Sequence, residues 1–288
     1  MKVLGVPRSG RRIELRRALV MGICNLTEDS LSGDGTLDLE VAAAQVSEML
    51  RQGADLIDVG AESARTNRQA IASEEEAERL LAFWAQWEAI LAKAGPRDDK
   101  QLWPPLLSWN TWRPEVVEKV LPVGGEILND MSALPDSRNA VACQAAGAAL
   151  LVMHNRGQVK VANQEQVYPD IWEELEGFFA EKVALAESVG LARERLILDP
   201  GIDFAKQKED NLAILRSAGR LNQFGCAVLL PISRKTVIGE VLGIGKAQAR
   251  DAGTLACLMA GLDEGADIFR VHAVAQAAEA VRLWDALQ

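Results

Sequence analysis

The sequence predicts an α/β fold, a (β/α)₈ TIM barrel with a short hairpin-like extension at its N-terminus. Short β-branched or apolar runs recur along the chain, and each is followed by a polar break and then a helical pattern. These runs are apolar throughout, which suits parallel strands that are covered on both faces. A length of 288 residues fits one such barrel, so we expect a single domain over residues 1–288.

The expected strands are the apolar runs at Leu19–Cys24, Leu56–Gly60, Leu106–Trp109, Glu126–Leu128, Ala149–Met153, Leu196–Leu198, Ala227–Ile232 and Ile268–Val271. Between them, Asp38–Gln52 and Glu74–Lys93 show the three- and four-residue apolar spacing of outer helices. No Gly-rich nucleotide turn follows the first strand, which favours a closed barrel over a doubly wound open sheet. Residues 1–18 precede that strand, and we expect them to form a hairpin that caps the lower end of the barrel.

Bulk composition excludes several classes of function. The formal charge of -10 argues against a nucleic-acid or anionic-membrane partner, because both favour clustered Lys and Arg. No stretch of about 18 uncharged apolar residues occurs and no signal-like run follows the N-terminus, so we expect a cytoplasmic protein. Widely spaced cysteines predict free thiols in a reducing compartment: Cys24, Cys143, Cys226 and Cys257.

Polar residues collect at the carboxyl ends of the expected strands, which in a barrel meet on the face that carries function. They are Asn25, Thr27, Asp29, Glu62, Arg65, Asn110, Asn129, Asp130, His154, Asp199, Ser233, Lys235, Arg270 and His272. Both histidines of the chain are among them. A histidine at a strand end is often only a structural hydrogen-bond donor. Taken alone, each histidine therefore fits a functional role and a structural role equally well.

Three groups of these residues indicate a chemistry. Arg270 and His272 point the same way on a strand and suit phosphate oxygens. Ser233 and Lys235 bring a hydroxyl and a cation to the mouth, although a solvated basic turn explains them equally well.

The third group is Asp199 with Asn110 and Asn129. Asp199 precedes a Pro-Gly turn and could be a simple stop signal. Opposite the two asparagines, it could instead bind a flat nitrogen heterocycle, because amide and carboxylate oxygens accept from ring N–H groups.

Longer motifs carry a family resemblance. They are MGICNLTEDS (Met21–Ser30), GADLIDVGAESAR (Gly53–Arg65), LND (Leu128–Asp130), LILDPGIDF (Leu196–Phe204), SRK (Ser233–Lys235) and RVH (Arg270–His272). In this order, and spread over nearly the whole chain, they closely resemble the dihydropteroate synthase family of pterin-binding TIM-barrel enzymes.

The resemblance implies a transferase of folate biosynthesis. Family members condense 6-hydroxymethyl-dihydropterin pyrophosphate with 4-aminobenzoate and release pyrophosphate with the help of Mg²⁺. By the same resemblance, Asn110, Asn129 and Asp199 would hold the pterin ring, Met153 would pack on it, and Lys235 would bond its edge. Lys235, Asp199 and Arg65 are the expected catalytic residues.

The resemblance also implies which residues bind the metal, the pyrophosphate and the aminobenzoate. Asn25 would be a Mg²⁺ ligand, and Arg65, Arg270 and His272 would surround the pyrophosphate, while Ser233 and Phe204 would line the aminobenzoate side. The loops Thr27–Thr36 and Glu62–Ile71 would close over the site. The outer helices Lys246–Leu262 and Ala275–Leu287 would form a homodimer.

Four positions depart from the family pattern. Asn110 stands where most members carry Asp, and Ala273 stands where Asp is common. Leu31 and Thr66 replace an aromatic residue and a proline that shape the aminobenzoate pocket. A non-catalytic or altered-specificity pterin-binding paralogue is therefore an alternative. A folate-dependent methyltransferase is a third, although the phosphate-binding set would then lack a purpose.

Overall fold

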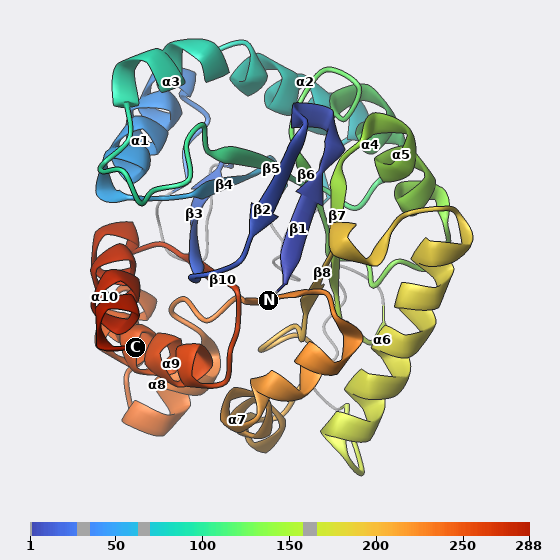
Figure 1. Ribbon diagram of the computed structural model, residues 1–288, viewed down its shortest axis with the longest axis vertical. Helices are drawn as coiled ribbons and strands as arrows, with labels where there is room; N and C mark the ends of the chain where they lie inside the picture. The colour runs from blue at the N-terminus through green and yellow to red at the C-terminus, as the bar shows by residue number, and fades with distance from the viewer. Residues whose placement is uncertain (1, 28–34, 63–69, 158–165) are drawn as a thin grey trace.

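A computed structural model describes residues 2–27, 35–62, 70–157 and 166–288. Parallel strands close into a barrel in the order β10-β3-β4-β5-β6-β7-β8-β9, with helices around the outside (Figure 1). The barrel strands are β3 Leu19–Asn25, β4 Leu56–Gly60, β5 Leu106–Asn110, β6 Ile127–Asp130, β7 Ala149–Met153, β8 Leu196–Asp199, β9 Ala227–Leu230 and β10 Ile268–Val271. The predicted TIM barrel is confirmed.

Several strands begin or end at a different residue from the one predicted. Strands β3, β5, β6 and β8 run one or two residues further than predicted, so each takes in a polar residue at its carboxyl end. Strand β6 also begins at Ile127, one residue after the predicted start. The prediction of Ala227–Ile232 was too long: β9 ends at Leu230, because Pro231 has no N–H to extend the ladder.

The α-helices among the described residues are α1 Leu39–Gln52, α2 Ser73–Trp84, α3 Trp87–Ala94, α4 Pro114–Val120, α5 Arg138–Ala146, α6 Ile171–Ser188, α7 Lys208–Arg216, α8 Thr236–Leu242, α9 Asp251–Asp263 and α10 Val274–Leu287. Short 3₁₀ turns lie at η1 Pro7–Ser9, η2 Arg193–Arg195, η3 Ala218–Phe224 and η4 Ala247–Arg250. The predicted helix at Asp38–Gln52 is confirmed, with Asp38 as its N-cap accepting from two backbone N–H groups.

Two helix predictions needed correction. Glu74–Lys93 is not one helix but two, interrupted after Trp84. Helix α2 packs mainly against α4, whereas α3 packs against α1. The predicted helix at Lys246–Leu262 begins as the 3₁₀ turn η4 and becomes α-helical at Asp251. No described helix has the length and apolar character that a membrane span requires.

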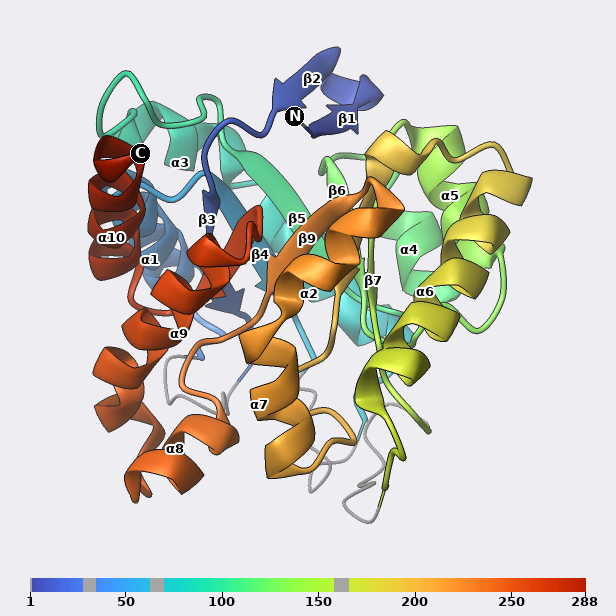
Figure 2. The ribbon, with the colours of Figure 1, turned by 60° about the horizontal axis from the view of Figure 1, so that its bottom comes forward.

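The N-terminal hairpin closes one end of the barrel, as predicted. Strands β1 (Val3–Val6) and β2 (Arg11–Glu14) pair antiparallel and stand beyond the end of the barrel (Figure 2). Leu4 and Val6 are fully buried in one apolar cluster with Leu19 and Met21 from the start of β3. The hairpin therefore keeps water from the lower layers of the barrel interior.

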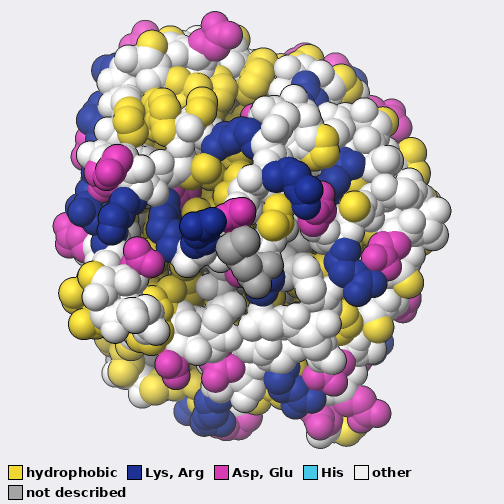
Figure 3. Space-filling model, viewed as in Figure 1, with side chains coloured by type: hydrophobic (Ala, Val, Ile, Leu, Met, Phe, Trp, Pro, Cys, Tyr) yellow, Lys and Arg dark blue, Asp and Glu magenta, His cyan; other side chains and the backbone are white. Residues whose placement is uncertain are grey.

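Lys and Arg side chains gather around the hairpin in Figure 3. Arg8 and Arg11 donate to the backbone carbonyls of Leu121 and Pro104. The other hairpin-end arginines pair with carboxylates, in the pairs Arg12–Glu194, Arg16–Glu14 and Arg17–Asp55. These contacts hold the hairpin in place and make this basic surface structural.

Candidate active site

Asp58, in the middle of β4, is the centre of the site. Its carboxylate is fully buried and accepts from Ser108 Oγ at 2.6 Å and Asn110 Nδ2 at 2.9 Å. It also accepts from Asn129 Nδ2 at 3.1 Å and Arg270 Nε at 2.7 Å. One carboxylate thus brings together three of the residues that the sequence predicted for the site. Asp58 itself was missed, because it lies inside an otherwise apolar strand.

The Asp58 carboxylate also decides which way the two asparagines face. Only the NH₂ group of an amide can donate to a carboxylate, so the Oδ1 atoms of Asn110 and Asn129 are left to point elsewhere. Both oxygens are buried and have no hydrogen-bond partner among the described residues. A buried acceptor without a partner costs about 1–3 kcal/mol. The site therefore holds two acceptors that a ligand with N–H groups would satisfy.

Asp199, the last residue of β8, adds a buried carboxylate to the same mouth. One of its oxygens accepts from Gly201 N at 2.7 Å. Burial raises the pKa of Asp199 to about 6, and the positive charges of Lys235, Lys206 and Arg270 limit the rise. Met153 pairs with Asp199 across the β7–β8 ladder and is buried in the interior cluster.

Lys235 reaches this mouth from the turn after β9. Its Nζ donates to Ile202 O at 2.7 Å and lies 4.8 Å from the centroid of the Phe204 ring. Burial lowers the pKa of Lys235, and the carboxylates of Asp203 and Asp199 oppose that effect. Lys235 and Phe204, predicted for different halves of the site, are therefore in contact.

Ser233 and His272 form a third contact between turns. Ser233 Oγ lies 2.7 Å from His272 Nδ1 and accepts from the backbone N of His272 at 3.1 Å. When the hydroxyl donates to Nδ1, the neutral ring carries its proton on Nε2 and can offer it to an anion. Arg270, two residues earlier, belongs to β10, and His272 directly follows the end of that strand.

Comparisons with known proteins agree with this geometry. Residues 21–272 match the family model described as pterin binding enzyme. The chain is 34% identical to the dihydropteroate synthase of Escherichia coli K12 over 278 residues, which is 96% of this chain and 94% of the relative. This chain belongs to the dihydropteroate synthase family.

Solved structures of the family share the fold over its whole length. The Xanthomonas albilineans dihydropteroate synthase with 4-aminobenzoic acid has a TM-score of 0.85 at 32% identity, covering 99% of this chain and 98% of that one. The Yersinia pestis dihydropteroate synthase in a sulfonamide drug complex has a TM-score of 0.87 at 30% identity, covering 100% and 99%.

Several residues that the sequence analysis singled out lie outside the described residues. These are Arg65, Asp29, Leu31 and Thr66, together with most of the loops Thr27–Thr36 and Glu62–Ile71. Asn25 is described: it is the last residue of β3 and is half-buried. Ala273, the remaining departure, is the N-cap residue of α10.

The described part of the chain contains no group of three or more His, Cys, Asp or Glu side chains that could hold a metal ion. Mg²⁺ is often held by one or two protein oxygens together with substrate phosphates. The amide oxygen of Asn25 at the barrel mouth fits a Mg²⁺ ion that binds together with pyrophosphate.

His154 has a scaffold role. It is fully buried, with Nε2 3.1 Å from Glu174 Oε1 and Nδ1 2.8 Å from Lys206 Nζ. Burial and the Lys206 charge lower the pKa of His154 to about 3, so the ring is neutral near pH 7. Burial lowers the pKa of Lys206 to about 7. Lys206, two positions after Phe204, was also missed by the sequence analysis.

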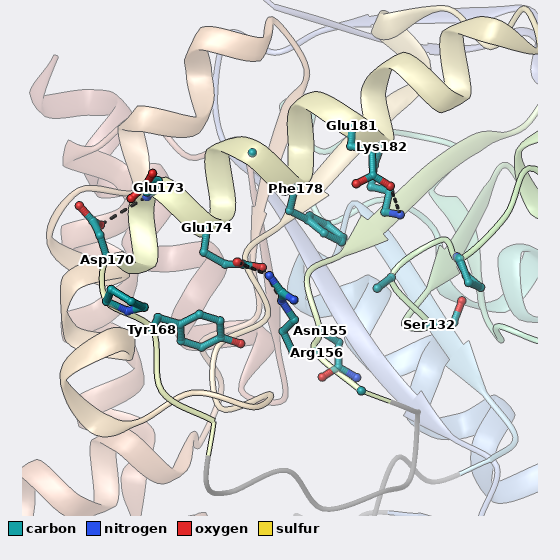
Figure 4. A pocket seen from close by; sticks show the side chains of 15 residues that line it. Ser132, Asn155, Arg156, Tyr168, Asp170, Glu173, Glu174, Phe178, Glu181 and Lys182 are labelled. Atoms are coloured by element: carbon teal, nitrogen blue, oxygen red, sulfur yellow. Dashed lines mark hydrogen bonds and ion pairs between the residues drawn. The ribbon is translucent and has the colours of Figure 1, made fainter.

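A separate cavity of about 640 Å³ lies beside α6 (Figure 4). Glu174 and Arg156 pair across it, and Tyr168 and Phe178 contribute aromatic walls. None of the predicted site residues lines it. Two of its lining residues contact strand ends of the barrel: Glu174 bonds His154, and Ser132 bonds Asp130.

Proposed function

We propose that this protein condenses 6-hydroxymethyl-dihydropterin pyrophosphate with 4-aminobenzoate and releases pyrophosphate, as a transferase of folate biosynthesis. One observation carries the proposal: the Asp58 carboxylate leaves two buried amide oxygens unpartnered at the barrel mouth, where β8 ends in the carboxylate of Asp199. The named activity of its relatives supports the proposal, as does the 4-aminobenzoic acid bound in one of them.

The ring would be recognised by matched donors and acceptors. Asn110 Oδ1, Asn129 Oδ1 and the Asp199 carboxylate would accept from the amino and N–H groups of the pterin. Lys235 would donate to the ring edge, and Met153 would pack against its face. The Asn110 amide would present an oxygen as an aspartate does, so this departure from the family pattern preserves an acceptor.

The reaction would need little covalent help from the protein. The C–O bond to pyrophosphate breaks, the aromatic amine forms the new C–N bond at the same carbon, and the amine loses a proton. Arg270, His272 and Arg65 would stabilise the charge that builds on the departing oxygens. Asn25 would hold a Mg²⁺ ion, which when bound would supply further positive charge to the leaving group.

The aminobenzoate would lie beside Ser233 and Phe204. Phe204 is half-buried and packs against the interior cluster, so its ring offers an apolar wall. Lys235, Asp199 and Arg65 remain the catalytic residues that we propose.

We also propose that residues 1–288 form one domain in a cytoplasmic homodimer built on α9 and α10. Leu283 and Leu287 of α10 are 62% and 70% exposed, which favours a covered apolar face there. No nucleic-acid or membrane partner is part of the proposal.

The test is pyrophosphate release by the purified protein. Release should require the pterin pyrophosphate, 4-aminobenzoate and Mg²⁺ together, and the protein should rescue a synthase-deficient strain. Lys235→Ala should lose most of the activity. Tight pterin binding without condensation or rescue would instead support the paralogue that Asn110 suggested, and a bound corrinoid partner would support a methyltransferase.

A further inference from the structure

The turn that follows β8 has an unusual backbone. Gly201, Asp203 and Ala205 all have positive φ, at 66°, 69° and 49°. The left-handed conformation costs a non-glycine residue about 1–2 kcal/mol. Such strain persists where surrounding contacts compensate for it, and it concentrates at functional sites. The contacts of Asp203 supply that compensation.

Asp203 is held in place by a residue of α7. Its backbone N donates to Asn211 Oδ1 at 2.8 Å, and its Oδ1 accepts from Asn211 Nδ2 at 3.3 Å. Asn211 is buried. The orientation of the Asp203 carboxylate is therefore set from its own side of the barrel mouth.

The same carboxylate reaches across to the next turn. It accepts from the backbone N of Thr236, and from the backbone N of Val237 at 3.2 Å. These are the first two residues of α8, and the N-cap residue of that helix is Lys235, whose side chain makes no capping bond. An ammonium group has no acceptor to offer. Asp203 therefore caps α8 from a different turn.

Lys235 returns the contact. Its Nζ donates to the carbonyl of Ile202, the residue before Asp203, and lies over the ring of Phe204, the residue after it. We use the name Asp203–Lys235 clasp for two sets of contacts between these turns: the α8 amides of Thr236 and Val237 donate to Asp203, and Lys235 donates to the carbonyl of Ile202. It joins the DPGIDF turn to the SRK turn at the point where both enter the site.

The charges around Lys235 come from several elements. Asp203 and Asp199 face it from the β8 side and favour its ammonium form, while Arg270 from β10 opposes that form. Lys206, in the segment between β8 and α7, is a further positive group nearby. Of the two carboxylates, Asp199 is the one proposed to contact substrate, whereas Asp203 bonds Asn211 and the first amides of α8 and acts on Lys235 through its charge.

We propose that Asp203 is a positioning residue that holds the Lys235 ammonium, and with it Phe204, at the edge of the pterin pocket. The role of Lys235 in this inference rests on the proposed function. The clasp itself does not, because it is a structural contact that can be measured in the absence of substrate.

The test compares two substitutions at Asp203 with a matched control. Asp203→Asn keeps the shape and tolerates positive φ but removes the charge. Asp203→Gly removes both the strain and the cap. Asp170→Asn is the control, since Asp170 caps α6 by accepting from Trp172 N at 2.7 Å and does not appear among the charges that act on Lys235.

The decisive readout is the alkaline limb of the pH profile of kcat/KM. Asp203→Asn should move that limb to lower pH by about one unit, because it removes a negative charge that stabilises the ammonium form of Lys235. Asp170→Asn should leave it in place. In a Lys235→Arg background the limb should disappear, and Asp203→Asn should then shift nothing, because arginine stays protonated.

An unmoved limb in a folded Asp203→Asn protein would overturn the proposal, as would an equal shift in Asp170→Asn. Hydrogen exchange of the Thr236 and Val237 amides tests the clasp separately. Exchange should quicken in Asp203→Gly, and unchanged exchange would refute the clasp. If the wild-type protein makes no dihydropteroate, the proposed function fails while this exchange result still decides the structural contact.

Discussion

Replacing Asp58 with asparagine should disable the site while the barrel still folds. The new side chain has the same shape, but it offers one acceptor and one NH₂ where the carboxylate offered two acceptors. Its neighbours Asn110, Asn129 and Arg270 all donate to Asp58 Oδ2. An NH₂ at that position would face three donors. In the opposite orientation Ser108 Oγ can accept from the NH₂, but a neutral amide oxygen with two lone pairs is then left to serve the same three donors.

The cost can be estimated from these contacts. The two amide bonds contribute about 1 kcal/mol each, and a bond to a charged group contributes about 1.5–3 kcal/mol. Arg270 keeps 21% of its side chain exposed, so its share belongs at the lower end. The total is about 3–4 kcal/mol, which corresponds to a loss of about 10²–10³ in kcat/KM for the pterin substrate.

The assay is steady-state kinetics together with equilibrium binding of a pterin analogue. Released amides can rotate and present NH₂ groups to the ring, so binding should weaken along with turnover. Asp130→Asn is the control, because Asp130 is also fully buried but bonds Ser132 and Asn139 instead. The reasoning is refuted if Asp58→Asn binds the analogue as tightly as wild type, or if Asp130→Asn loses as much affinity.

Three further results are expected. Asn110→Asp places a second carboxyl against Asp58, so one of the pair should stay protonated to higher pH and a new titration should enter the pH profile of kcat/KM; an unchanged profile would contradict this. The pKa of Asp199 is raised from 3.8 to about 6, so its contribution to stability is full below about pH 4 and lost as pH rises through 6. Asp199→Asn should therefore raise the free energy of unfolding at pH 8 but not at pH 4, which urea denaturation can measure. The affinity of the wild-type protein for the pterin should fall below about pH 6, where the Asp199 carboxylate becomes protonated. Gly201→Ala should lower the free energy of unfolding by about 2–5 kcal/mol, because its Cβ would lie 2.0 Å from His154 O at a φ of +66°. Thermal unfolding measures this change, and a variant as stable as wild type would disprove that geometry.

Much of the site was accessible from the sequence because a parallel barrel sends the carboxyl ends of all its strands to one face. Asn110, Asn129, Asp199 and Arg270 were predicted on that basis, and they do meet there. Their roles in turnover remain predictions. Asp58 could have been found as well, since it lies two positions after the inward-facing Leu56 and so shares its side of the strand.

Other features had no local signal. Asp203 looks like an ordinary turn residue in DPGIDF, and nothing near it in sequence shows that it caps a helix 33 residues away. The break between α2 and α3 was also invisible, because the apolar spacing continues across it while the packing partners change.

The sequence by itself determined the order of strands and helices, the apolar interior and the polar ends of the strands, since all of these follow from patterns a few residues long. Tertiary structure alone decided that Arg270 meets Asp58 across 212 positions of chain. The physical reason is closure: β10 pairs with β3 and β3 with β4, and the stagger of those ladders sets which inward side chains share a layer.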